Sequence, residues 1–120
     1  MGDIEKNMNC AAAQLRKTQI SVSNQKKRIF ISHPYKNSPD VNKNKTQEIC
    51  KQVMEDGHLP ISPLHLFSFM NDDSARDDII AWCLDMINLC DEIWVFGDSE
   101  GCNIERIHAE NNGKVVKLMY

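Results

Sequence analysis

The chain has 120 residues and is therefore too short for two independent cores. Of these residues 42% are hydrophobic and 26% charged, a composition typical of one globular domain. No apolar run approaches the ~18 residues of a membrane-spanning helix, and the first thirty residues lack the apolar segment of a secretory signal, so we expect a cytoplasmic protein. Residues 1–51 carry ten Lys/Arg against four Asp/Glu, and residues 52–120 carry four against thirteen. The lysines are scattered, with only Phe30 and Tyr35 as aromatic neighbours, so we expect no nucleic-acid and no membrane partner.

The cysteines and histidines do not form a recognisable metal or disulfide pattern. The five cysteines are Cys10, Cys50, Cys83, Cys90 and Cys102. Their odd number and the absence of a CxxC pair favour reduced, mostly buried thiols. Because His33, His58 and His65 do not share helical spacing with an acidic partner, we expect no metal and no cofactor.

The first half of the chain predicts an extension, a strand and a helix. Residues 1–27 are polar and are interpreted as an extension that is flexible or forms a short helix, and residues 28–120 as the domain. The continuous apolar run from Arg28 to Ser32 is typical of a strand buried on both faces. Apolar residues then recur at helical spacing from Val41 to Met54, and Asp56-Gly57 ends this helix. His58 to Ser62 predicts a short strand in an edge or an end position, because it contains and precedes a proline.

The second half continues the alternation. An apolar loop is expected from Leu64 to Met70, followed by a helix from Ala75 to Leu89. Strands are expected over 91–96, with Trp94 buried by its strand, and over 114–119, with a helix over 102–111 between them. This order predicts an α/β, three-layer, flavodoxin/Rossmann-like parallel sheet of about four strands with helices on both faces. Ligands of such sheets bind at the carboxyl ends of the strands.

Three loops are expected to meet at that edge, and the third is the most informative. Gly97-Asp98-Ser99-Glu100-Gly101 joins a strand to a helix, which places backbone N–H groups, the Ser99 hydroxyl and the positive end of a helix dipole around one point. This arrangement predicts an anion site, although Ser99 could equally serve only as the helix cap. Glu105 lies in the first turns of the same helix. Carboxylates paired in a desolvated cleft can divide into a nucleophile and a general acid, whereas the alternative for Glu105 is a solvated surface position.

The segment from Cys90 to Glu105, continued by His108 to Val116, resembles the nucleoside 2-deoxyribosyltransferase-like superfamily and its small phage and bacterial relatives. Ile29 to Tyr35 and Leu59 to Pro63 resemble those relatives too, so that the similarity covers residues 28–120. Its sharpest part is the Ser-x-Gly-x-x-x-Glu pattern at Ser99, Gly101 and Glu105.

The resemblance implies roles for individual residues. Glu105 would attack the anomeric carbon of a 2-deoxyribosyl group, and Asp85 would protonate the departing base, with Asp91 as a competing candidate for that second role. Branches acting on 5′-monophosphates are similar to this chain in having serine where free-nucleoside transferases tend to carry aspartate. Substrate-binding residues are expected in the first and third loops. They are Ser32, His33, Tyr35, Gly97, Asp98, Ser99 and Gly101.

The leading hypothesis is therefore an N-glycosidic-bond hydrolase, similar to the deoxynucleoside monophosphate N-hydrolase-like branch and acting on (deoxy)nucleoside 5′-monophosphates. Two departures favour a non-catalytic nucleotide-binding protein as an alternative: His33-Pro34-Tyr35-Lys36 replaces a Gly/Arg-rich loop, and Arg106 and His108 follow Glu105. A deoxyribosyltransferase is the third hypothesis. Because Trp82 and Leu89 form a second stripe on their helix and the loop from Leu64 to Met70 is apolar, we also expect a homodimer or higher homo-oligomer.

Overall fold

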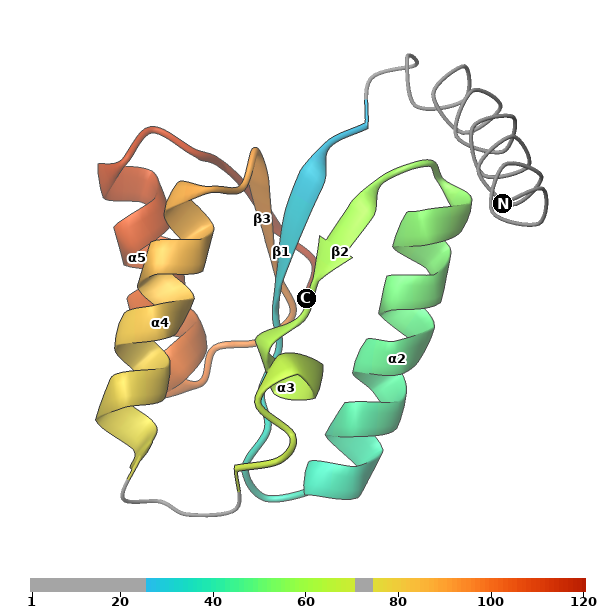
Figure 1. The fold of residues 1–120 in the computed structure, drawn as a ribbon, viewed down its shortest axis with the longest axis vertical. Coiled ribbons are helices and arrows are strands. Elements are labelled where there is room, and N and C mark those ends of the chain that lie inside the picture. The colour runs from blue at the N-terminus through green and yellow to red at the C-terminus, as the bar shows by residue number, and fades with distance from the viewer. Residues whose placement is uncertain (1–25, 71–74) are drawn as a thin grey trace, which may run out of the picture.

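The computed structural model describes residues 26–70 and 75–120 (Figure 1). Four parallel strands form one sheet in the order β2-β1-β3-β4. The strands are β1 (Arg28–Ser32), β2 (Leu59–Ile61), β3 (Glu92–Val95) and β4 (Val115–Leu118). The short β2 is an edge strand, as its prolines indicate. This arrangement confirms the expected α/β fold with a parallel sheet.

Helices cover both faces of the sheet, as Figure 1 shows. Helix α2 (Pro39–Glu55) lies on one face, and α4 (Arg76–Asn88) and α5 (Glu100–Asn111) lie side by side on the other. Helix α2 starts at a proline, whose fixed φ suits the first helical turn, and is followed by Gly57 in the left-handed region at φ 88°. Within residues 26–70 and 75–120, no helix is long and apolar enough to cross a membrane.

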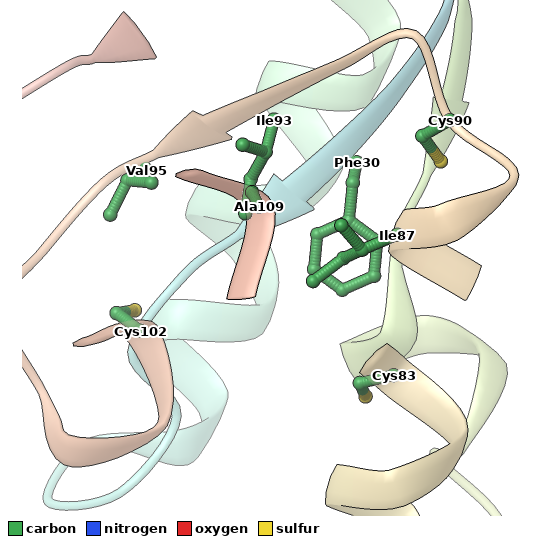
Figure 2. Close-up of a cluster of buried hydrophobic side chains, with 8 residues drawn as sticks. All are labelled: Phe30, Cys83, Ile87, Cys90, Ile93, Val95, Cys102 and Ala109. Carbon is green, nitrogen blue, oxygen red and sulfur yellow. The ribbon is translucent and has the colours of Figure 1, made fainter. Parts of the chain in front are cut away.

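The core consists of two apolar layers, one on each face of the central strand β1. Because side chains alternate along a strand, Ile29 and Ile31 face α2 and pack with Val53, while Phe30 faces α4 and α5. Figure 2 shows the second layer, in which Phe30 and Ile93 meet side chains from both helices. The five side chains named here are at most 1% exposed: Ile29, Phe30, Ile31, Val53 and Ile93. The alternation also turns Ser32, the last residue of β1, toward the layer of α4 and α5.

Three local details differ from the sequence-based expectation. Residues 64–66, expected in a loop, belong to the single-turn helix α3 (Pro63–Leu66), whose first residue is a proline. Helix α5 begins at Glu100, two residues earlier than expected, because Ser99 caps it. Trp94, expected to be buried, is only partly so: it lies beneath the ammonium group of Lys117, which is 5.4 Å from the ring centroid.

Candidate functional site

A cavity of about 420 Å³ opens at the carboxyl ends of β1 and β3. Its walls come from the end of β1 and the following loop, from α3 and the residues after it, and from the facing ends of α4 and α5. The lining residues are Ile31, His33, Tyr35, Lys36, Pro63, Leu64, Phe67, Ser68, Met70, Arg76, Ile79, Ile80, Cys83, Ser99, Glu100, Gly101, Cys102 and Glu105. The position agrees with the rule that open parallel sheets bind ligands beyond the carboxyl ends of their strands.

Glu105 supplies the partly buried carboxylate of this cavity. Its Oε1 accepts a hydrogen bond of 2.8 Å from the Ser32 hydroxyl. Burial raises the pKa of Glu105 from 4.5 to about 7, and hydrogen bonds from Ser32 and Cys83 act in the opposite direction. The carboxylate is therefore close to half-ionised near neutral pH, which is the range in which a carboxyl group exchanges protons or attacks a substrate.

Two buried thiols surround this carboxylate. Burial is the first cause that raises the pKa of Cys83 to about 12, and the neighbouring negative charge and hydrogen bond of Glu105 add to it. Burial likewise raises the pKa of Cys102, and the neighbouring Ser32 and Ser99 side chains act in the opposite direction. Both thiols are therefore neutral near pH 7, so that they contact the carboxylate without repelling it.

Ser99 caps a helix and also lines the cavity. Its Oγ accepts a hydrogen bond of 3.3 Å from the backbone N–H of Cys102, which caps α5. Ser99 also lines the cavity together with Gly101, at the positive end of the helix dipole. The cap uses the Ser99 oxygen as an acceptor and does not involve the hydroxyl proton.

The mouth of the cavity carries cationic side chains. Arg76, in the first turn of α4, forms an ion pair of 3.0 Å with Glu100 in the first turn of α5. Lys36 and the half-exposed Tyr35 line the same opening from the loop after β1. The cavity thus combines an apolar interior, one deep carboxylate and positive charge near its entrance.

Of the ten site residues predicted from the sequence, five line the cavity: His33, Tyr35, Ser99, Gly101 and Glu105. Ser32 lies behind the wall, 1% exposed and bonded to Glu105. Gly97 packs against the Pro34 ring, whose Cδ would lie 2.9 Å from a Cβ at this position, so its role is close packing between two loops. Asp98 is exposed and outside the lining.

The structure does not bring the other predicted carboxylates to Glu105. Asp85 is exposed on α4, because it shares the outward stripe of Trp82 rather than the inward stripe of Cys83. Asp91 precedes β3, so it lies at the amino ends of the strands, where its Oδ2 accepts a 2.7 Å hydrogen bond from the Arg28 backbone N–H. That hydrogen bond lowers the pKa of Asp91. The sheet length therefore separates Asp91 from the cavity.

The residues that follow Glu105 also lie outside the cavity lining. Arg106 pairs with Glu110 one turn later on α5, at 2.9 Å. The His108 Nε2 lies 2.8 Å from the Asn88 Oδ1. Neither Arg106 nor His108, the two residues that depart from the expected pattern after Glu105, therefore blocks the site.

Sequence reasoning did not assign Arg76 or Cys83 to the site. Arg76 begins α4, and a charge at the start of a helix is more often solvated. Cys83 belongs to the apolar stripe of that helix, and its contact with Glu105 arises only when α4 and α5 pack together, so no local sequence pattern indicates it. Among the residues that the structure describes, no three His, Cys, Asp or Glu side chains gather in a way that could hold a metal ion.

The family assignment comes from comparison with known families. The family model described as "Domain of unknown function (DUF7768)" matches residues 27–119. The chain belongs to this family. No match was found among curated proteins.

Members of one enzyme class share the fold of this DUF7768 chain. A 2-desoxiribosyltransferase from Leishmania mexicana matches with a TM-score of 0.62 and 21% identity, over 77% of this chain and 63% of that protein. A 2-deoxyribosyltransferase from the psychrotolerant bacterium Bacillus psychrosaccharolyticus matches with a TM-score of 0.61 and 21% identity, over 76% of this chain and 70% of the other. The chain thus has the 2-deoxyribosyltransferase-like fold and spans less than two thirds of the Leishmania protein's length.

Proposed function

We propose that this protein cleaves the N-glycosidic bond of (deoxy)nucleoside 5′-monophosphates, with Glu105 as the nucleophile. The observation that carries the proposal is the Glu105 carboxylate, which lies in an apolar cavity at the carboxyl ends of the strands and is held by Ser32. The fold shared with two 2-deoxyribosyltransferases supports the same class of bond.

The chemistry requires Glu105 in its ionised form. A carboxylate oxygen forms a bond to the anomeric carbon while the carbon–nitrogen bond breaks and its electron pair goes to the base. A water molecule protonates the departing base, and the hydroxide that it leaves hydrolyses the glycosyl ester, which regenerates the carboxylate. Water takes this part because Asp85 and Asp91 lie away from the cavity.

The phosphate is proposed to bind at the start of α5. There the Ser99 hydroxyl and the helix dipole favour an anion, and Lys36 adds positive charge at the entrance, where the Arg76 guanidinium is paired with Glu100. A free nucleoside would gain nothing from these groups. The first loop contributes an aromatic side chain to the cavity wall, because His33 lines the cavity and stacks on Phe96 with the ring centroids 5.9 Å apart.

A second candidate is a non-catalytic nucleotide-binding protein. Glycosidic-bond enzymes generally use two carboxylates near the reacting carbon. Among the described lining residues, the only carboxylate besides Glu105 is Glu100, which is exposed and paired with Arg76 at the mouth. A protein that only holds a nucleotide does not need the second carboxylate.

The experiment that separates these functions is incubation of the protein with a panel of deoxynucleoside and ribonucleoside 5′-monophosphates, followed by chromatography for free base. Base release by the wild-type chain and its loss in Glu105→Gln support the hydrolase. Glu55→Gln, at the exposed end of α2, is the matched control with the same loss of charge. Saturable binding without base release would establish the binding protein, and exchange only after addition of a second base would establish a transferase.

We also propose that the protein assembles as a homodimer. Trp82 and Leu89 are 59% and 66% exposed on the outward face of α4, and Phe69, after α3, is 74% exposed. Large apolar side chains in such number on one small chain favour a covered surface. A second copy is the simplest partner that could cover it.

A further inference from the structure

The hydroxyl of Ser32 donates its hydrogen bond inside the protein. Ser32 is 1% exposed and does not line the cavity, so that it has no access to a ligand. Its hydroxyl donates to Glu105 Oε1 at 2.8 Å. The role that the sequence suggested for Ser32, direct substrate binding, is therefore replaced by contact with the reactive carboxylate.

The fold explains why a serine stands at this position. Along β1, Phe30 and Ser32 point to the same face, and Phe30 is part of the apolar layer beneath α4 and α5. A buried hydroxyl in an apolar layer costs stability unless it forms a hydrogen bond. Glu105, which α5 brings over the end of β1, supplies the acceptor.

The groups around Glu105 come from three elements. Ser32 approaches from β1 and Cys83 from α4, while Cys102 lies one turn earlier on α5, next to Ser32. The remaining titratable groups of the cavity are farther toward the mouth or in the first loop. They are His33, Tyr35, Lys36, Arg76 and Glu100.

We propose that Ser32 is a positioning residue that fixes the Oε1 atom of Glu105 and leaves Oε2 for the substrate. The catalytic part of this inference rests on the proposed function, whereas the contact between Ser32 and the carboxylate does not. The hydrogen bond also favours the ionised carboxylate, because a hydroxyl donor stabilises negative charge. Ser32 thus counteracts the burial that makes Glu105 retain its proton.

The decisive measurement is the pKa of Glu105 in protein labelled with ¹³C at the glutamate carboxyl carbons, followed by NMR. Hydrogen bonds to charged groups contribute about 1.5–3 kcal/mol, so Ser32→Ala is expected to raise this pKa by at least about 1. Ser32→Cys retains the size of the side chain and a weak donor, and its pKa for Glu105 should lie between those of the wild type and Ser32→Ala.

The matched control is Thr46→Val. Thr46 is 0% exposed and its hydroxyl donates to the Asn42 carbonyl at 2.7 Å, within α2 on the other face of the sheet. This variant removes an equally buried hydroxyl without contact to Glu105, so the pKa of Glu105 should stay at the wild-type value. An unchanged pKa in both Ser32 variants, or an equal rise in Thr46→Val, would overturn the proposal.

The pH profile of base release gives a second, separate readout. If the pKa rises from about 7 to about 8, Ser32→Ala should lose about tenfold in kcat near pH 6 and less than twofold near pH 9. A purely structural defect would lower kcat equally at both pH values. If the NMR pKa moves but no variant, including the wild type, releases base, the proposed function fails while the positioning role stands. Base release with an unmoved pKa would support the proposed function and overturn the positioning role.

Discussion

The replacement of Glu105 by glutamine should stabilise the fold while it abolishes the proposed activity. The pKa of Glu105 is raised from 4.5 to about 7, chiefly by burial. Between these two values the folded chain binds a proton that the unfolded chain has released, so the stability of the wild type falls as the pH rises from 4.5 to about 7. Above that window the loss is complete and amounts to about 3 kcal/mol, because one pKa unit corresponds to about 1.4 kcal/mol.

Glutamine has nearly the same shape and no charge, so Glu105→Gln escapes this loss. Relative to the wild type, its free energy of unfolding should rise by about 2 to 3 kcal/mol between about pH 5 and pH 8. The other shifted carboxylates do not interfere. Hydrogen bonds from Lys27 and Trp94 are the first causes that lower the pKa of Glu92 to about 2, so its stabilisation is lost only as the pH falls below 4.5.

The assay is urea unfolding followed by far-UV circular dichroism at both pH values. Titration of the histidines is common to both proteins and cancels in the difference between them. Glu55→Gln should differ from the wild type by less than about 0.5 kcal/mol at either pH, as expected for an exposed side chain. A stability difference between Glu105→Gln and the wild type that does not change with pH would refute the burial argument.

Three further predictions concern substrate, catalysis and assembly. Ser99→Asp should weaken binding of nucleoside monophosphates about tenfold or more and of free nucleosides much less, because it places a negative charge at the proposed phosphate site. Calorimetry with each nucleoside and its monophosphate measures the two losses of affinity, and equal losses would contradict a phosphate site there. Asp85→Asn and Asp91→Asn should each retain base release, measured by chromatography, within about twofold of the wild type, because neither carboxylate reaches the cavity. A loss approaching that of Glu105→Gln in either variant would restore a catalytic role to the replaced aspartate. Light scattering should give at least twice 13.8 kDa for the wild type and a smaller mass for Trp82→Glu, whereas a wild-type monomer would exclude the dimer.

The strands were predictable because their signal is local. Arg28 to Ser32 is a continuous apolar run, and a strand between two others in a parallel sheet with helices on both faces requires such a run. The Gly-x-Ser-x-Gly segment likewise placed Ser99 and Gly101 correctly at the start of a helix. Since parallel strands end at one edge, the sequence also located the cavity at the carboxyl ends of the strands.

The partners of Glu105 were not predictable, because they depend on helix rotation and on distant contacts. Asp85 has the chemistry of a general acid, although its own stripe contains Trp82 and faces outward. Two residues earlier, Cys83 lies on the inward stripe. From the sequence alone, a thiol there looks like an ordinary core residue, because its contact with Glu105 depends on how α5 packs against α4. Ser32 has the same ambiguity, since a loop-proximal serine at the end of a strand contacts ligand in many proteins.

The cysteines of the described chain are not all equivalent in what they do for the fold. Cys83, Cys90 and Cys102 all pack in the apolar layer, and Cys83 and Cys102 also lie next to the Ser32–Glu105 pair. A carboxylate in the place of Cys83 would repel the charge on Glu105 and raise its pKa further. An aliphatic side chain there would offer no donor. A neutral thiol is small enough for the core and polar enough to donate weakly, so the arrangement keeps the pKa of a buried glutamate near 7 and its ionised form accessible.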